Sequence, residues 1–363
     1  MGDPLRHVKP AVRALKAYTL AARQAPIKIN QNENPFELPE AMKRRVVERA
    51  LARPWGRYPE FDPHALTTAL AEFAGWRPDG VLAGNGSNEL IEALLLVTVG
   101  PGTKVVIPEP TFTLYALLTS ILGGEAVRVA LGPDLEYDAE TIAQARRQRE
   151  ASVTIVCSPN NPTGTLWHSA LAFLAERLDG RALLVVDEAY VEFADAPSAT
   201  ALLDRHENVA ILRTLSKAHA LAGARIGALI APAALAAFIG RIAAPYPLPS
   251  PSIELALAAL EPAALEATRV RIGAIRAERE RLRASLAGLR GVRAVWPSEA
   301  NFVLARFDDA RAAFDGALAA GVLVRDVSDQ LGLAGCLRIT VGAAAENAAL
   351  LGALDEAAVG ALA

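Results

Sequence analysis

The stretch that decides the fold of this chain runs from Val209 to Lys217 and reads VAILRTLSK. Its first part, Val209–Arg213, is a short aliphatic run of the kind that forms a buried strand. A lone lysine after a strand is usually a solvated surface charge. Lys217, however, sits between this strand and a second apolar stretch, with Arg225 shortly beyond. A lysine that is partly desolvated and fixed at a strand end has the setting of a Schiff-base nucleophile, so we single out Lys217 as a functional residue.

Short apolar runs like this one alternate with helical patterns through the first two-thirds of the chain. The helical patterns include Asn88–Val99, Thr113–Leu122 and Ser169–Leu178. Such alternation predicts an α/β fold in which a mainly parallel sheet lies between helices. Ligands of such sheets bind at the carboxyl ends of the strands. The seven expected strands are Gly80–Gly84, Lys104–Ile107, Ala126–Val129, Val153–Cys157, Ala182–Asp187, Val209–Arg213 and Ile226–Ile230.

A proline-rich stretch, Ala244–Pro251, interrupts this pattern and can continue neither a helix nor a central strand. A long helical pattern follows from Pro262 to Leu289, and after it come two strand-like pieces, Ala300–Arg306 and Cys336–Val341. This arrangement predicts a second, smaller α+β domain. We expect an N-terminal arm over residues 1–42 that contributes to the small domain and to a dimer contact, a large domain over 43–245 and a small domain over 246–363.

Composition excludes several classes of protein. The chain has 363 residues, 52% of them hydrophobic, and a formal net charge of −3. A disordered chain is excluded, and the near-neutral charge argues against a nucleic-acid binder. No apolar run is long enough for a membrane span, and the five histidines show no metal-ligand spacing. Two cysteines are too few for a disulfide framework, and the N-terminus lacks a secretion signal, so we expect a cytoplasmic protein. Because the histidines lack ligand spacing, we expect no metal.

An acidic motif closes another expected strand, in the sequence from Val185 to Tyr190. Asp187 falls at the carboxyl end of that strand, where ligands bind. An aspartate there can simply cap a helix. Alternatively, it is an anion that holds a proton on a heteroaromatic nitrogen, a contact worth roughly 4 kcal/mol at a separation of 4 Å. Tyr190 could donate a hydrogen bond into the same site.

Two turns complete the set of candidate motifs. The stretch from Ser158 to Gly164 reads SPNNPTG and follows the buried strand Val153–Cys157. Ordinary turns share this composition, but the exposed amide side chains between two prolines favour a binding role. The second turn, Ala83–Glu89, opens a helix, and free amides at a helix start bind phosphate. It lacks the glycine spacing of a dinucleotide site.

Together these motifs resemble the class II aminotransferases of fold type I, which depend on pyridoxal phosphate, and within them the histidinol-phosphate aminotransferases. The resemblance runs from about Ile29 to Val341. It implies a large domain with a mainly parallel seven-stranded sheet, a small α+β domain and the cofactor pyridoxal 5′-phosphate. The motifs that carry it are Asn32–Phe36, Arg57–Glu60, Asn85–Ser87, Pro159–Gly164, Asp187–Tyr190, Thr214–Lys217, Leu221–Arg225, Val324–Asp326 and Leu337–Thr340.

The resemblance assigns roles in catalysis. Lys217 forms the Schiff base with the cofactor and then moves the proton between the substrate and the cofactor. Asp187 keeps the pyridine nitrogen protonated, so that the ring can accept electrons. Asn161 and Tyr190 hydrogen-bond the 3′ oxygen of the cofactor, and Phe112 stacks on its ring, where the family often has tyrosine.

The same resemblance places the cofactor phosphate at the helix start. The amides of Gly86 and Ser87 hold it together with Ser216 and Arg225. Tyr58 reaches the phosphate from the neighbouring subunit, which implies a homodimer with shared sites.

Two arginines are matched to the substrates, which are small molecules. Arg338 corresponds to the residue that binds the carboxylate of the amino-acid partner through a bidentate fork, and Asn161 is also counted among the substrate-binding residues. Arg325 corresponds to a residue for the phosphate of histidinol phosphate, with Tyr18 of the partner's N-terminal arm as a helper. Either arginine alone would more commonly form a surface ion pair, but their spacing around a glycine-containing loop favours the shared site.

The resemblance implies conversion of L-histidinol phosphate and 2-oxoglutarate to imidazole acetol phosphate and L-glutamate, a step of histidine biosynthesis. Three alternatives stay open: an aromatic amino-acid aminotransferase, a lyase like threonine-phosphate decarboxylase, and a non-enzymatic regulator. Two departures from the family pattern stand out. Ala218, His219 and Ala220 follow the lysine where the family usually has an aromatic residue and then glycine, and Asn88 stands where it prefers aspartate. We interpret His219 as a packing residue.

Overall fold

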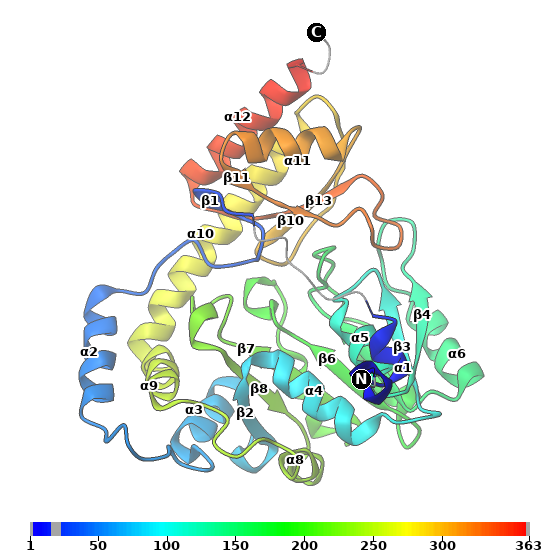
Figure 1. The fold of residues 1–363 in the computed structure, drawn as a ribbon, viewed down its shortest axis with the longest axis vertical. Helices are drawn as coiled ribbons and strands as arrows, with labels where there is room; N and C mark the ends of the chain where they lie inside the picture. Colours follow the sequence, from blue (N-terminus) through cyan, green and yellow to red (C-terminus); the bar gives the residue numbers. More distant parts are fainter. Residues whose placement is uncertain (1–2, 16–22, 361–363) are drawn as a thin grey trace.

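The computed structural model describes residues 3–15 and 23–360 and shows a large body built on one sheet, with a smaller body above it (Figure 1). The sheet has seven strands in the order β2-β8-β7-β6-β5-β3-β4. Within it β8 runs antiparallel to both of its neighbours, and the other adjacent strands are parallel. All seven expected strands and the mainly parallel sheet are therefore confirmed. The strands are β2 (Val81–Asn85), β3 (Lys104–Glu109), β4 (Glu125–Ala130), β5 (Val153–Cys157), β6 (Leu183–Asp187), β7 (Val209–Thr214) and β8 (Ile226–Ile230).

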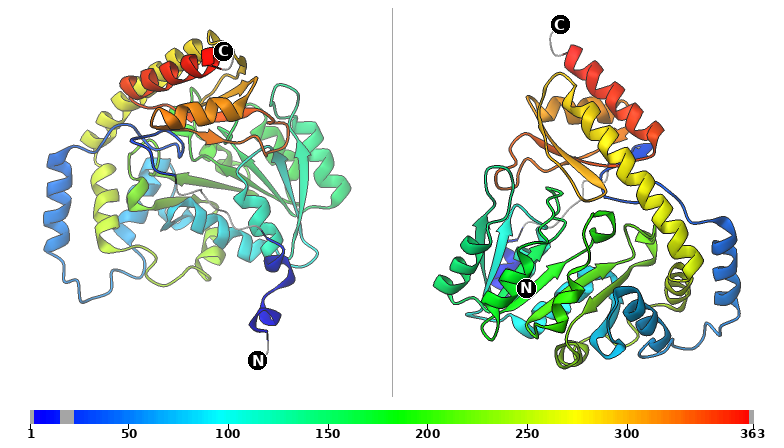
Figure 2. Two further views of the ribbon diagram at one scale, coloured as in Figure 1. Left: turned by 45° about the horizontal axis from the view of Figure 1, so that its top comes forward. Right: turned by 180° about the vertical axis from the view of Figure 1, so that it is seen from behind.

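Helices cover both faces of this sheet (Figures 1 and 2), which explains why its central strands are nearly all apolar. Every residue of β5, β7 and β8 is buried. Val106 and Leu174 belong to the apolar cluster on one face, whereas Val105 and Leu94 belong to the cluster on the other. The helices of the large body are α3 (His64–Ala74), α4 (Gly86–Thr98), α5 (Leu114–Ile121), α6 (Ala139–Arg149), α7 (Leu171–Leu178) and α8 (Ala233–Gly240), with the 3₁₀ helices η2 (Pro78–Gly80), η3 (Val191–Phe193), η4 (Ala199–Asp204) and η5 (Ala222–Ala224).

The small body holds an antiparallel sheet in the order β12-β13-β10-β9, flanked by the long helix α10 (Figure 2). The chain enters it early, because β1 (Ile27–Lys28) pairs in parallel with β11 near the other end of the sequence. Ile29 consequently packs in the same apolar core as Phe302 and Ile339. The elements of this body are α10 (Pro262–Ala287), β9 (Val292–Val295), β10 (Phe302–Phe307), α11 (Ala310–Ala319), β11 (Val322–Leu323), β12 (Arg325–Asp326), β13 (Cys336–Thr340) and α12 (Ala344–Gly360).

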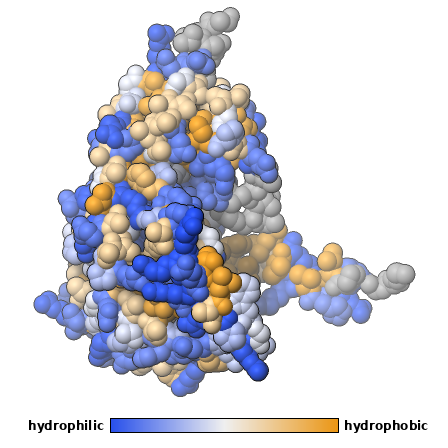
Figure 3. All heavy atoms as spheres, turned by 90° about the vertical axis from the view of Figure 1, so that its left-hand side faces the viewer, coloured by the Kyte–Doolittle hydropathy of each residue, from blue (hydrophilic) through white to orange (hydrophobic). Residues whose placement is uncertain are grey.

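Two helices lie against each other along one side of the molecule. α2 (Glu40–Leu51) packs against α9 (Ser250–Ala259), and Ile253 of α9 lies in the apolar cluster that also contains Leu66 of the large body. By its packing, α9 belongs with the large body. The domain limits expected from the sequence stay a prediction. Figure 3 shows the face that carries α2, where hydrophilic and hydrophobic residues are interspersed. Exposed apolar side chains on α2 and just after it are Val47, Leu51, Trp55, Tyr58 and Phe61.

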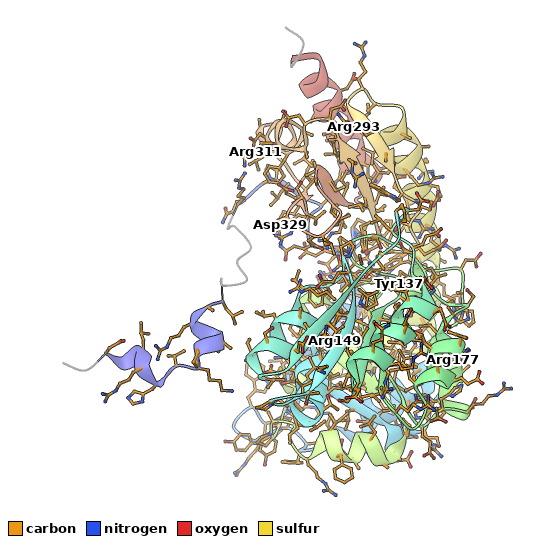
Figure 4. The ribbon with its side chains drawn as sticks, turned by 90° about the vertical axis from the view of Figure 1, so that its right-hand side faces the viewer. Tyr137, Arg149, Arg177, Arg293, Arg311 and Asp329 are labelled. Atoms are coloured by element: carbon orange, nitrogen blue, oxygen red, sulfur yellow. The ribbon has the colours of Figure 1, made fainter. Side chains whose placement is uncertain are left out.

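The N-terminal arm projects from the large body beside α5 (Figures 1, 2 and 4). It contains η1 (Pro4–His7) and α1 (Pro10–Arg13), and α1 contacts α5 without burying any residue. Tyr18, which the resemblance assigns to the substrate site, lies outside the described residues. In the part of the chain that the structure describes, no helix has both the length and the apolar character to cross a membrane.

Candidate active site

A cavity of about 730 Å³ opens between the two bodies, at the carboxyl ends of the central strands. Its floor is lined by Cys157, Asp187 and Thr214, which are the last residues of β5, β6 and β7. A volume of this order suits a small-molecule site. Ten of the residues singled out from the sequence share this cavity: Ser87, Phe112, Asn161, Asp187, Tyr190, Ser216, Lys217, Arg225, Arg325 and Arg338.

Lys217 lies in the loop that follows β7, with its side chain in the cavity. Its Nζ donates a hydrogen bond to the backbone oxygen of Gln31 at 2.9 Å. Burial, reinforced by the positive charges of Arg338 and Arg225, lowers the pKa of Lys217 to about 8, against an opposing effect of Glu33. The amine therefore loses its proton more readily than an ordinary lysine, which suits both nucleophilic attack and proton transfer.

Asp187 ends β6 and is 3% exposed. Its Oδ2 accepts a hydrogen bond from the Tyr115 hydroxyl at 2.5 Å, and its Oδ1 accepts one from the backbone N–H of Ala189 at 3.0 Å. Burial raises the pKa of Asp187, while the two hydrogen bonds favour its charged form. A buried carboxylate held in this way can stabilise a proton on a heteroaromatic nitrogen.

Asn161 and Tyr190 stand near each other around Arg338. Asn161 Oδ1 accepts a hydrogen bond from Arg338 Nη1 at 2.6 Å, and the Tyr190 hydroxyl accepts one from Asn32 Nδ2 at 3.0 Å. Burial raises the pKa of Tyr190 to about 12, although Arg338 and Asn32 oppose this rise. Tyr190 therefore stays protonated at neutral pH, and its hydroxyl can donate a hydrogen bond.

The start of α4 forms a cradle that leaves no room for a side chain at Gly86 or at Gly227. A Cβ on Gly86, whose φ is +76°, would lie 2.1 Å from Arg225 Nη2. A Cβ on Gly227 of β8 would lie 2.4 Å from the backbone nitrogen of Ser87. Arg225 Nη1 also donates to Ser216 Oγ at 3.2 Å. Free amides at a helix start, a guanidinium and hydroxyl groups converge here, and this donor set fits a phosphate group.

Phe112 supplies an aromatic face to the same cavity. It lines the cavity and packs edge-on against the ring of Tyr115, with 5.6 Å between the ring centroids. Together with the cradle, Lys217 and Asp187, it forms a set of groups that fits the phosphate, ring and aldehyde of pyridoxal phosphate.

The small body contributes two arginines to the cavity lining, from adjacent strands. Arg325 of β12 and Arg338 of β13 are register partners, and Arg338 Nη2 donates to the backbone oxygen of Asn30 at 2.6 Å. Arg325 and Asp329 line the same cavity, and Figure 4 labels Asp329 where the small body faces the large one. The two arginines can therefore bind an anionic substrate group.

Tyr58 is not brought into the cavity of its own chain. Its side chain is 80% exposed and stacks on Tyr246 at 4.5 Å between ring centroids. His219 likewise stands apart from the cavity lining: it is 2% exposed and packs edge-on against Phe73 at 5.1 Å. Burial lowers the pKa of His219 to about 4, so it is neutral and suits the packing role expected of it.

Sequence reasoning gave no role to several residues that hold the site together. Tyr115 was one residue of an expected apolar helix, with no signal for its contact to Asp187. Asn32 and Asn34 belonged to a motif of the resemblance, and Asn34 Nδ2 donates to the backbone oxygens of Lys217 and Ala218, both at 3.0 Å. The close spacing of Asn32 and Asn34 is a further sequence signal that could have pointed to these two residues.

Comparison with known proteins identifies the family of the chain. Residues 25–355 match the family model described as aminotransferase class I and II. The chain belongs to this family. It is 42% identical to a histidinol-phosphate aminotransferase of Stenotrophomonas maltophilia, over 97% of each chain. It is 44% identical to that of Xanthomonas euvesicatoria, over 96% of each chain.

A solved structure shares the fold as well. The chain is similar to histidinol-phosphate aminotransferase from Sinorhizobium meliloti in complex with pyridoxal 5′-phosphate, with a TM-score of 0.88, 28% identity and 98% of each chain covered. The fold-type I architecture expected from the sequence is therefore confirmed. Within residues 3–15 and 23–360 no group of three or more histidine, cysteine or acidic side chains is arranged to hold a metal ion.

Proposed function

We propose that this aminotransferase converts L-histidinol phosphate and 2-oxoglutarate to imidazole acetol phosphate and L-glutamate, with pyridoxal 5′-phosphate as its cofactor. One observation carries the proposal: a single cavity is lined by Lys217 and Asp187 and also by Arg325 and Arg338. The first pair serves transamination, and the second provides positive charge for a substrate phosphate or carboxylate. The relatives named for the same reaction support this assignment.

The residues present fit the cofactor. Ser87, Ser216 and Arg225 would hold its phosphate, Phe112 would cover its ring, and Asp187 would face its ring nitrogen. When bound, pyridoxal phosphate supplies an electron sink that makes removal of a proton from the substrate carbon feasible.

The chain's own groups then handle protons and charge. Lys217, with its pKa lowered to about 8, takes and returns the proton at the substrate carbon. Asp187 keeps a proton on the nitrogen that faces it, because a buried anion strongly favours a nearby positive charge. Arg338 binds a carboxylate of 2-oxoglutarate or glutamate through its guanidinium fork, and Arg325 binds the phosphate of L-histidinol phosphate. Asn161 holds Arg338 in place.

The working enzyme is a homodimer in this proposal. Tyr58 is exposed on its own subunit, with Trp55 and Phe61 exposed on the same segment. Solvent exposure of several aromatic residues on one short segment is typical of an interface. Tyr58 of one protomer completes the phosphate cradle of its partner. Tyr18 helps at the phosphate end, also from the partner.

The proposal places the enzyme in the cytoplasm. Both cysteines, Cys157 and Cys336, are buried and unpaired, which suits a reducing compartment. Its partners are small-molecule substrates and a second copy of the chain.

Absorbance spectroscopy tests the proposed reaction. The protein with pyridoxal phosphate is expected to show a visible band that L-histidinol phosphate alone removes and that 2-oxoglutarate restores. Loss of the band with phenylalanine but not with L-histidinol phosphate would favour an aromatic aminotransferase instead. Release of carbon dioxide without 2-oxoglutarate would favour a lyase.

A further inference from the structure

Asn32 lies at the centre of a buried hydrogen-bond network between the two bodies. Its backbone N–H donates to Thr340 Oγ1 at 2.9 Å, and its side-chain amide contacts both Thr340 and Tyr190. Asn32, Thr340 and Tyr190 are 1%, 2% and 5% exposed. Asn32 also has φ of +56°, a left-handed conformation that asparagine tolerates better than most residues. Since water is excluded here, each donor and acceptor in the network must be matched within the protein.

The hydrogen bonds of this network run in one direction, which starts from the backbone N–H of Asn32. A backbone N–H can only donate, so the Thr340 hydroxyl accepts from Asn32 and sends its own proton elsewhere. That proton goes to Asn32 Oδ1, which lies 3.1 Å from Thr340 Oγ1. Because Oδ1 accepts from Thr340, the NH₂ group of the same amide must face Tyr190, where the distance is 3.0 Å. The Tyr190 hydroxyl therefore accepts this bond and keeps its own proton available.

The proton of Tyr190 has no acceptor among the residues of ranges 3–15 and 23–360. Tyr190 lines the cavity with Lys217 and Asn161, so the free proton is available to a group bound there. We propose that Asn32 and Thr340 are positioning residues, which fix the Tyr190 hydroxyl as a donor to the 3′ oxygen of pyridoxal phosphate. This inference rests on the cofactor assigned under the proposed function.

The network also ties Tyr190 to the strand that carries Arg338. Thr340 stands in β13 together with Arg338, and Asn301 Nδ2 donates to the backbone oxygen of Asn32 at 3.1 Å. Both Thr340 and Asn301 belong to the small body. The donor direction of Tyr190 is therefore set by the same strand that carries the carboxylate-binding arginine.

The test uses the pH midpoint at which the visible absorbance of the bound cofactor changes. A donor to the 3′ oxygen stabilises its negative charge and lowers this midpoint, so Tyr190→Phe is expected to raise it by about one to two pH units. Asn32→Asp keeps the shape of the side chain but offers only acceptor oxygens, which turn the Tyr190 hydroxyl away from the cofactor. We expect this substitution to raise the midpoint too.

A double-mutant cycle separates this effect from the added negative charge. In the background of the Tyr190→Phe variant, Asn32→Asp can act only through its charge. We expect the shift caused by Asn32→Asp to be larger by at least about one pH unit when Tyr190 is present. Equal shifts in the two backgrounds would overturn the inference, because Asn32 would then not act through Tyr190.

An uncharged pair of variants checks the other end of the network. Thr340→Val removes the hydroxyl that pins Asn32 Oδ1 and is expected to raise the midpoint, whereas Thr340→Ser is expected to keep the wild-type value. If both variants keep the wild-type midpoint and a native circular dichroism spectrum, the inference about Asn32 and Thr340 is overturned, whereas the proposed function is not. A wild-type protein that gains no visible absorbance with pyridoxal phosphate would overturn the proposed function as well.

Discussion

The hydroxyl of Tyr115 donates a hydrogen bond to Asp187 Oδ2 at 2.5 Å, and both side chains are buried. The two residues come from α5 and β6, and the contact forms because the parallel sheet brings the ends of these elements together (Figure 1). The bond stabilises the charged form of a carboxylate whose burial works against that charge. Under the proposed function, Tyr115 is thus a positioning residue for the carboxylate that would face the ring nitrogen of the cofactor.

Removing this hydroxyl should weaken the enzyme. In Tyr115→Phe the Asp187 carboxylate loses a charge-assisted hydrogen bond, which is worth about 1.5–3 kcal/mol. We expect kcat to fall about tenfold or more and the Kd for pyridoxal phosphate to rise. Steady-state kinetics and equilibrium dialysis measure the two effects.

Tyr137 provides a matched control. It is a half-buried tyrosine in the same body, but its hydroxyl donates to the backbone oxygen of Cys157 at 2.7 Å rather than to Asp187. Tyr137→Phe should leave kcat within about twofold of wild type. If the two variants lose the same activity, the Tyr115–Asp187 bond has no special role in catalysis.

The lowered pKa of Lys217 predicts a pH dependence of stability in the cofactor-free protein. The folded-state pKa is about 8, below the ordinary lysine value of 10.5, so between these values the unfolded chain binds more protons than the folded one. The free energy of unfolding should therefore rise with pH through this window relative to a protein without the lysine. Urea unfolding of wild type and Lys217→Met, at one pH just below about 8 and another between about 9 and 10, measures it. A wild-type-minus-variant difference that stays constant or falls would refute the lowered pKa.

Ala220 adopts a left-handed backbone, with φ of +58°, shortly before the 3₁₀ helix η5. A residue with a Cβ pays roughly 1–2 kcal/mol for this conformation, whereas glycine does not. Ala220→Gly is therefore expected to raise the free energy of unfolding by up to about 1 kcal/mol, once the greater flexibility of unfolded glycine is included. Ala222→Gly, at a position without positive φ, should lower it. Chemical unfolding of both variants decides the matter, and destabilisation by both would contradict the prediction.

Arg325 should determine the preference for a phosphorylated substrate. Loss of a charged hydrogen bond to phosphate costs about 1.5–3 kcal/mol, so Arg325→Ala should raise KM for L-histidinol phosphate by about ten- to a hundredfold. The KM for phenylalanine should change far less. Arg311→Ala serves as the control, because Arg311 is exposed on α11 and pairs with Asp315. An equal rise in KM for both substrates would remove Arg325 from the phosphate site.

The sequence predicted the strands and the cavity well because both depend on local patterns. An apolar run followed by polar residues marks a strand end, and parallel strand ends share one edge of a sheet. Asp187 and Lys217 therefore met as expected. Contacts such as Tyr115 to Asp187 and Asn32 to Thr340 depend on packing across 72 and 308 positions of sequence, and no local pattern encodes them. The role assigned to Tyr58 requires a second chain, and this assignment remains a prediction.

Nitrogen transfer from labelled substrate tests the central claim most directly. L-Histidinol phosphate carrying ¹⁵N in its amino group is incubated with 2-oxoglutarate, pyridoxal phosphate and either the wild-type protein or Lys217→Ala, and glutamate is analysed by mass spectrometry. The account predicts ¹⁵N-glutamate in equal amount to imidazole acetol phosphate with wild type, and neither product with Lys217→Ala. Glutamate without ¹⁵N in both samples, or equal ¹⁵N labelling of glutamate by the two proteins, would contradict the proposed reaction.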